Sequence, residues 1–431
     1  MDMSVLMKDN IYNKFKNLYK LNKKYFYFNK SKTDLYKLKN FLKKELLYDN
    51  QKLLFKYLNN NLLINSKSLP INNNNKLFKL LFPIDAVILF FINGKINKKF
   101  SNINNKYYKI NINYTNHNNN FFKKNIYHYL SESFTKKNIL IDINHTKNIN
   151  SKKPLYIVYF NDKNKKNEIA IFNYRNFIYV KNIFSTIIEH YINTDKLYIN
   201  NVYNTFIINN NSKLEHYTFI TNNNIINNNF CSINNEFILY NNVSYKKYDV
   251  LMSNQYINQN NNFKFLGEKT KLVYNSLSFS KNSNIININN YLEHDKKNSC
   301  SVQIHKAVTL DQSIINLIGL LKINKHAIKT NGQLNYSVLL LNKLSKINIQ
   351  PYLDILNNDV KCTHSVFTGK INYNQIFFLR TRGISLKKSY SILLISFILD
   401  SLDEISNNII KNEILQKILC YLSVENIFNE F

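Results

Sequence analysis

Two side chains that can bind iron, copper or zinc lie two residues apart near the C-terminal end of the chain, Cys362 and His364. Side chains alternate between the two faces of a β-strand, so a thiol and an imidazole at this spacing share one face of an extended segment. Two ligands do not fill a coordination sphere. The pair therefore predicts a metal site that other ligands, for example from a partner chain, would complete. The same pair also fits a small buried cysteine beside a surface histidine.

Arginine is rare in this sequence, and two of its three arginines lie shortly after the Cys-x-His pair. Arg380 and Arg382 fall at the end of a segment with helical spacing, residues 372–382, where positive charge is favourable. Gly383 follows and can supply the left-handed exit of that helix. We interpret the two arginines as charges that fix the helical region to the preceding part of the chain, and not as catalytic groups.

Several runs around this region resemble one family. They are Pro351-Tyr352-Leu353-Asp354-Ile355, Asp359-Val360-Lys361-Cys362-Thr363-His364, Gly369, and Phe377-Phe378-Leu379-Arg380-Thr381-Arg382-Gly383-Ile384. The pattern resembles the C-terminal signature of the SufB/SufD family of iron-sulfur cluster assembly proteins, and favours its SufD branch. A glycine usually follows the histidine in this family, whereas here the residue is Ser365. The likeness extends over roughly the last two thirds of the chain and is faint before about Lys153.

The resemblance implies a scaffold subunit, not an enzyme. It implies a heterodimer with a SufB-like paralogue that transiently holds a nascent iron-sulfur cluster at the shared seam. His364 is the first candidate ligand of this cluster, and Cys362 is the second. Cys362 could instead relay sulfur or simply pack. A SufC-like ATPase would dock on the C-terminal helices between residues 383 and 422, and a cysteine desulfurase would supply sulfur, mainly to the SufB side. A reduced flavin has also been suggested for the family's complex.

The middle of the chain consists of short apolar or aromatic runs separated by asparagine, with few glycines or prolines. Strictly alternating segments such as residues 285–292 predict short strands. Corners made of asparagine favour a solenoid, because stacked amides can bond to one another along its axis. Hairpin sandwiches fit the pattern as well. The resemblance implies a right-handed parallel β-helix, and hence a mainly β fold with helical regions at both ends.

We therefore predict three regions. Residues 1–105 form an N-terminal helical region, residues 106–371 the β-helix, and residues 372–431 a C-terminal helical region. Within the last region, Ser385 is a suitable N-cap for a second helix through about Asp403, and a third helix runs over residues 409–422. His190 and His216, each between Glu and Tyr, are interpreted as structural surface residues. His294 is interpreted as a residue at the end of a rung that bonds to backbone.

The formal charge of +31 suggests nucleic acid or another anionic partner. The excess is lysine scattered from end to end, which is expected of an AT-rich genome, whereas base and phosphate recognition favours arginine. We therefore expect no nucleic-acid partner. The alternative hypothesis is a basic organellar or bacterial RNA-binding protein. A β-helix hydrolase of polysaccharides is a third, but acidic residues are sparse for a carboxylate pair.

Four cysteines, far apart and without a Cys-x-x-Cys pair, argue against a structural zinc site and a disulfide scaffold. A reducing compartment follows: bacterial cytoplasm with an AT-rich reduced genome, or alternatively plastid stroma. The N-terminus lacks the apolar core of a signal peptide. Residues 77–92 form the most apolar stretch, but Pro83 and Asp85 interrupt it, so we expect a buried element and no membrane association. Six isolated glycines provide no nucleotide-binding loop.

Overall fold

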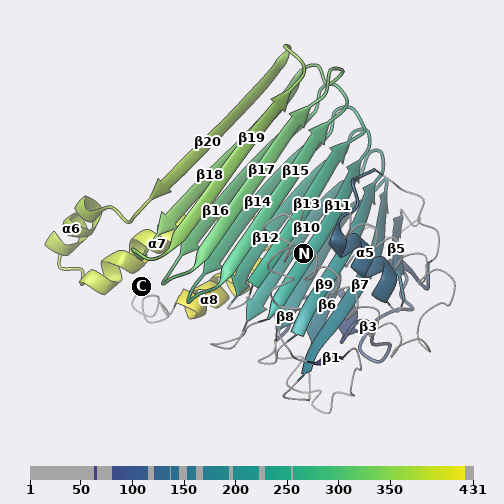
Figure 1. Ribbon diagram of the computed structural model, residues 1–431, viewed down its shortest axis with the longest axis horizontal. Coiled ribbons are helices and arrows are strands. Elements are labelled where there is room, and N and C mark those ends of the chain that lie inside the picture. The colour runs from purple at the N-terminus through teal and green to yellow at the C-terminus, as the bar shows by residue number, and fades with distance from the viewer. Residues whose placement is uncertain are drawn as a thin grey trace, which may run out of the picture.

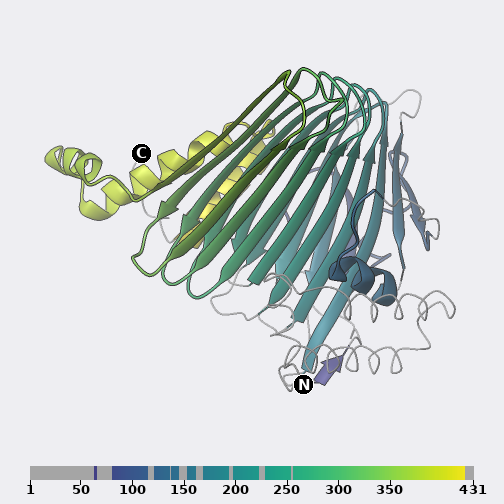
Figure 2. The same cartoon turned by 45° about the horizontal axis from the view of Figure 1, so that its top comes forward.

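The computed structural model describes residues 63–65, 80–114, 121–135, 137–144, 153–161, 168–193, 198–222, 229–253 and 256–422. These residues form a long parallel β-helix with helices along one side and beyond one end (Figures 1 and 2). The mainly β solenoid with C-terminal helices confirms the predicted fold class.

Two sheets make up the solenoid, and from β5 onward successive strands alternate between them. The first sheet contains β1 (Leu63–Asn65), β4 (Lys109–Ile112), β5 (Ile139–Asn144), β7 (Glu168–Lys181), β9 (Tyr198–Ile208), β11 (Phe230–Leu239), β13 (Tyr256–Phe265), β15 (Ile285–His294), β17 (Ile314–Ile323) and β19 (Lys346–Ile355). The second contains β2 (Val87–Ile92), β3 (Lys95–Ile96), β6 (Leu155–Asn161), β8 (Phe184–Asn193), β10 (Lys213–Asn222), β12 (Ser244–Ser253), β14 (Lys271–Ser280), β16 (Cys300–Thr309), β18 (Thr330–Leu340) and β20 (Val360–Gly369). All pairs are parallel except the short end pairs β2 with β3 and β4 with β5.

Asparagine forms the corners, as the sequence predicts. Five corner asparagines adopt a left-handed backbone with φ between 46° and 61°, a conformation that asparagine tolerates better than most residues. They are Asn182, Asn211, Asn242, Asn282 and Asn298. Amides also stack at a corner, where Asn242 Nδ2 donates to Asn211 Oδ1 at 3.0 Å.

A longer ladder of amides runs inside the solenoid. Asn176 donates to Asn204 (2.9 Å), Asn204 to Asn235 (3.1 Å), Asn235 to Asn261 (2.9 Å) and Asn261 to Asn290 (3.1 Å). All five are buried. Successive members are 26 to 31 residues apart, which is one turn of the solenoid. The ladder satisfies polar groups that would be costly to bury alone, and it fixes the register of the first sheet.

The helices cover the outer face of the second sheet. After α6 (Tyr373–Thr381), the helices α7 (Leu386–Leu402) and α8 (Asn408–Leu422) pack apolar residues against strand side chains such as Phe219 and Val250. Tyr248 OH donates to the Glu404 carbonyl (2.7 Å), and Lys306 Nζ to the Phe397 carbonyl (2.8 Å). A fourth helix, α5 (Ile126–Phe134), lies against the first sheet (Figure 1). Within the described residues, no helix is long and apolar enough to cross a bilayer.

The C-terminal helices begin directly after the last strand of the solenoid. Asn372 and Ser385 are the N-caps of α6 and α7. Most of residues 1–79, where we predict helices, lies outside the described residues. The solenoid itself begins before residue 106, because β2 pairs with β6 along its whole length. The apolar stretch 77–92 supplies this buried strand, as expected.

Two of the predicted histidine environments are wrong. His190 and His216 are both fully buried, not on the surface. Their Glu-His-Tyr tripeptides do not occupy equivalent positions, because His216 pairs with Ile187 and His190 with Phe219. An offset of three residues reverses the face. His216 therefore points into the solenoid, whereas His190 packs beneath the helices, where its ring stacks on Phe82 at 4.7 Å.

Candidate functional site

The strands β19 and β20 end the two sheets at the C-terminal end of the solenoid. Among the described residues, neither strand has a partner on its outer edge. Unpaired backbone N–H and C=O groups on such edges can pair with a strand of another chain. Large apolar side chains are exposed here too: Tyr352 is 50% exposed, Val366 45% and Phe367 57%. This end therefore has the features of an interface.

Cys362 and His364 lie on β20, and their side chains share the face that looks into the solenoid. Cys362 is paired with Gly332, and His364 with Leu334, which is completely buried in the interior core. Cys362 packs against that same core. Because β20 is the last strand of its sheet, no further rung among the described residues covers His364, and its side chain is exposed. The strand geometry therefore agrees with the predicted common face.

The two side chains differ in their surroundings. Cys362 is half-buried, and this burial raises the pKa of its thiol above the ordinary value, while a hydrogen bond from the Gly332 backbone acts in the opposite direction. Metal binding requires the thiolate, so a cation must displace the proton. The imidazole of His364, in contrast, is exposed at the open end of the solenoid. This difference supports the order of the predicted ligands, with His364 first and Cys362 second.

The donor set is incomplete within this chain. Among the described residues, no group of three His, Cys, Asp or Glu side chains could hold a metal ion. Cys300 cannot join Cys362, because it lies in line with Lys361 and so projects from the opposite face. His294 is buried and its Nε2 is 2.9 Å from Ser301 Oγ, so its partner is a side chain and not the predicted backbone. Any iron bound at His364 would need ligands from outside the described residues.

Arg380 and Arg382 lie at the end of α6, as predicted, and Gly383 has the left-handed φ of 82°. Both arginines are exposed. The guanidinium carbon of Arg382 lies 4.1 Å from the ring centroid of Phe378 in the same helix. The attachment of helices to solenoid that we predict for these arginines is instead made by α7, α8 and their connection.

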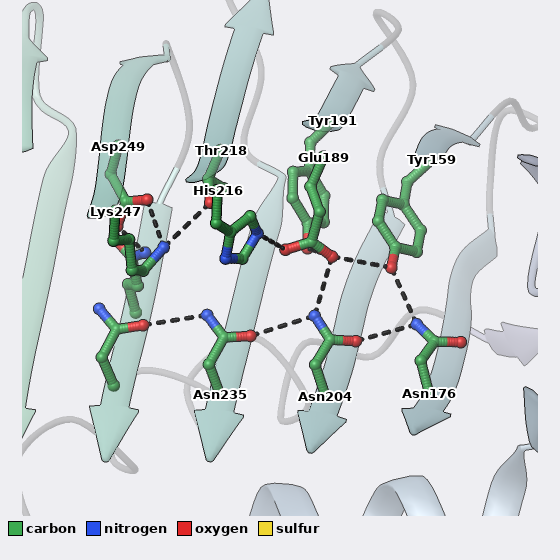
Figure 3. Close-up of polar contacts among 12 residues, drawn as sticks. Tyr159, Asn176, Glu189, Tyr191, Asn204, His216, Thr218, Asn235, Lys247 and Asp249 are labelled. Atoms are coloured by element: carbon green, nitrogen blue, oxygen red, sulfur yellow. Dashed lines mark hydrogen bonds and ion pairs between the residues drawn. The ribbon is translucent and has the colours of Figure 1, made fainter. Parts of the chain in front are cut away.

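A chain of buried polar side chains inside the solenoid was not predicted from the sequence (Figure 3). Glu189 accepts from Tyr159 OH (3.1 Å) and Asn204 Nδ2 (2.9 Å), and its other oxygen lies 3.0 Å from His216 Nε2. One turn further, Lys247 Nζ and Asp249 Oδ1 form a fully buried ion pair at 2.5 Å. Alternation along β12 could have indicated this burial, because Lys247 and Asp249 share one face of the strand with the apolar residues Tyr245 and Leu251.

Desolvation and charge oppose each other in this ion pair. Burial alone would raise the pKa of the Asp249 carboxyl, but the charge of Lys247 and hydrogen bonds from Lys247 and Tyr274 outweigh it and leave the pKa below its ordinary value. Gln259 Nε2 also donates to the carboxylate at 2.6 Å. Asp249 is thus ionised and fully hydrogen-bonded, which is the condition for a buried charge.

This chain matches a known class of protein, which the solenoid and the Cys-x-His pair on its last strand also fit. The family described as SUF system FeS cluster assembly, SufBD core domain, matches residues 161–397 of the chain. This is more than half of the sequence and includes β20 with both candidate ligands. The chain belongs to this family of iron-sulfur cluster assembly proteins.

Within the family, the chain is SufD-like. It is 30% identical over 171 residues to the iron-sulfur cluster assembly protein SufD of Escherichia coli, covering 40% of each chain. It is 29% identical over 150 residues to the chloroplastic protein ABCI7 of Arabidopsis thaliana, covering 34% of this chain and 31% of that protein. It is 28% identical over 178 residues to SufD of Plasmodium falciparum, covering 41% of this chain and 12% of that protein. The chain thus spans two fifths or less of each of these relatives. The family match favours cluster assembly over the RNA-binding hypothesis.

Proposed function

We propose that this chain is the SufD-like subunit of a scaffold that builds iron-sulfur clusters with a SufB-like paralogue and a SufC-like ATPase. The observation that carries the proposal is the open end of the solenoid, where β20 presents Cys362 and His364 beside unpaired strand edges. A SufB-like partner would extend the sheets from β19 and β20 and cover Tyr352, Val366 and Phe367. Its own side chains would complete the ligand set.

The incomplete ligand set suits a scaffold, because a cluster held by few donors from each of two chains can be released when the chains separate. The nascent cluster is the cargo of this site, not a resident cofactor. His364 binds iron through its imidazole, and Cys362 contributes a thiolate once the metal displaces its proton. Sulfur arrives from a cysteine desulfurase by way of the SufB-like partner.

The helices beyond the solenoid are the proposed docking site of the ATPase. The helix α6 projects away from the strands (Figures 1 and 2) and exposes Tyr373 (79%), Phe377 (68%) and Phe378 (54%). Exposed aromatic groups of this kind are enriched in the centres of protein interfaces. Because α7 and α8 are packed on the second sheet, a force applied to them reaches the solenoid and, through it, the seam.

Co-expression with a SufB-like and a SufC-like protein tests the proposal. The three proteins should co-purify, and His364→Ala should leave the complex assembled but reduce the cluster yield after reconstitution with iron and sulfide. Thr363→Ala is the matched control, because its side chain lies on the same strand but projects from the opposite face. Normal cluster yield with His364→Ala would show that His364 is not a ligand of the cluster. Failure of the wild-type chain to associate with either protein would remove the scaffold itself.

Cys362→Ser separates the possible roles of the thiol. As a ligand, Cys362 should lower cluster yield even when sulfide is supplied directly. As a sulfur relay, it should matter only when sulfur comes from the desulfurase. Cys420→Ser, an exposed cysteine of α8 far from β20, is the control.

Compartment and flavin stay predictions. A bacterial cytoplasm and a plastid stroma both provide the reducing conditions that free thiols require, and the relatives above come from a bacterium, a chloroplast and a parasite. Subcellular fractionation of the source organism distinguishes the compartments. The visible absorption spectrum of the reduced and reoxidised complex tests whether a flavin is bound.

A further inference from the structure

A cavity of about 330 Å³ lies at the end of the solenoid opposite Cys362 and His364. Its walls come from the hairpin of β2 and β3, from β4, β5 and β7, and from the segment after α5. This volume is at the lower end of the range typical of small-molecule sites. The cavity is remote from the seam, so the function proposed above makes no use of it.

The rim of the cavity is positively charged. The exposed side chains of Lys95, Lys98 and Lys137 line it, and so does the buried Arg175. Of the described residues that line the cavity, none is acidic. Arg175 is already engaged in the wall, because its Nε donates to Glu132 Oε1 at 3.0 Å and its Nη1 to Thr205 Oγ1 at 2.9 Å. Lys98 and Lys137 therefore supply net positive charge at the rim, and the cavity favours an anion.

The floor of the cavity is apolar and is held in place by packing. Phe91 and Tyr174 contact each other edge to face with ring centroids 5.6 Å apart, and Ile139 is buried beside them. Tyr174 OH accepts from the backbone N–H of Gly94 (2.9 Å), which fixes the left-handed turn between β2 and β3. This turn also positions Lys95, the next residue. A ligand that fits must present a flat or apolar body to this floor.

Two polar atoms in the cavity wall lack hydrogen-bond partners among the described residues. They are Asn176 Oδ1 and Thr135 Oγ1, and both are buried. Figure 3 shows that the Asn176 carbonyl oxygen points away from the amide ladder. Because every amide of the ladder donates in the same direction, Asn176 is its acceptor end, and aligned hydrogen bonds strengthen a terminal acceptor. An unpartnered buried acceptor destabilises the folded protein, and a donor on a ligand would offset that cost.

We propose that this cavity binds a phosphorylated compound with a flat ring that donates hydrogen bonds, of the size of a nucleoside monophosphate. The phosphate lies among Lys95, Lys98 and Lys137, because lysines bind phosphate well as point charges. The ring lies over Phe91 and Tyr174 and directs an N–H or O–H group to Asn176 or Thr135. The proposal is independent of cluster assembly, and only ligand binding at this end of the solenoid tests it.

Isothermal titration of the full chain with AMP, adenosine and inorganic phosphate tests the proposal at 150 mM salt. AMP should bind at least tenfold more tightly than either fragment, because only AMP engages both rim and floor. Equal binding of AMP and phosphate would reduce the site to a surface anion contact and overturn the proposal, as would the absence of AMP binding. At higher salt the AMP affinity should fall, since the lysines are exposed to screening.

Two variants localise the binding. Lys98→Glu with Lys137→Glu reverses the rim charge and should weaken AMP at least tenfold, whereas Lys325→Glu with Lys343→Glu makes the same charge change at exposed positions near the other end. Ile112→Trp fills the cavity from β4 and should abolish AMP binding while the circular dichroism spectrum is unchanged. If both charge-reversal pairs have the same effect, or if Ile112→Trp binds AMP normally, the ligand is not in this cavity.

Discussion

Lowering the pH from 7.5 to 5.5 should destabilise this protein strongly through three buried histidines. Burial lowers the pKa of His190 and His294 to about 3, and that of His305 to about 4. The nearby Lys417 charge lowers the pKa of His190 further, whereas the Asp249 charge partly offsets the shift at His305. In the unfolded chain each imidazole titrates near its ordinary pKa of about 6.5.

The sign follows from proton counting. At pH 5.5 the unfolded state binds protons at these histidines and the folded state does not, so the stability that they contribute is full above pH 6.5 and is lost as the pH falls. Between pH 7.5 and pH 5.5, each histidine lowers the free energy of unfolding by about 1.4 kcal/mol, and the three together lower it by about 4 kcal/mol. This is a large part of a typical free energy of unfolding. Carboxylates with a lowered pKa, such as Asp249, lose their contribution only at lower pH.

Urea unfolding followed by far-UV circular dichroism at pH 7.5, 6.5 and 5.5 measures this dependence. His294→Leu should reduce the pH-dependent loss by about 1.4 kcal/mol, because it removes one titrating group from an apolar setting beside Phe265. His326→Ala, at an exposed position, is the control. Burial raises the pKa of Glu236 and acts in the opposite sense, so the comparison between variants is more decisive than the total. An unchanged pH dependence in His294→Leu would refute the reasoning.

Two further perturbations follow from the structure. Lys247→Met leaves the Asp249 charge buried without its partner and should cost about 3 to 5 kcal/mol in urea unfolding, while Lys247→Met with Asp249→Asn should recover much of this loss. Additive effects of the two substitutions would show that the pair is not coupled. Gly383→Ala forces a left-handed φ of 82° on a residue with a side chain and costs about 1 kcal/mol, so amide exchange in α6 should accelerate roughly fivefold while β14 is unaffected. Equal exchange in both proteins would mean that the turn adapts without strain.

Local rules predicted much of the fold. Alternation located strands such as residues 285–292, and the N-cap Ser385 and the exit glycine Gly383 were correctly identified because capping depends on neighbouring residues alone. The Cys-x-His pair was found for the same reason, since two residues on one strand share a face whatever the rest of the fold does.

The interior could not be predicted in this way. Alternation separates two faces of a strand but does not say which faces inward, and in the second sheet both faces are buried, one by the core and one by α7 and α8. His190 and His216 therefore look alike in sequence and lie on opposite sides of the sheet. The ion pair of Lys247 and Asp249 depends on neighbours one or more turns away, and the cavity depends on four separate segments.

The position of α7 and α8 has a consequence for synthesis. The connection between these helices contacts strands made much earlier: Ser406 Oγ lies 3.3 Å from Tyr217 OH, and the two residues are 189 positions apart. At about 5 to 20 residues per second, a ribosome needs on the order of 10 to 40 s to bridge that distance. During this time the apolar outer side of β10 and its neighbours is without its cover, so the growing chain should depend on chaperones until its final helices emerge.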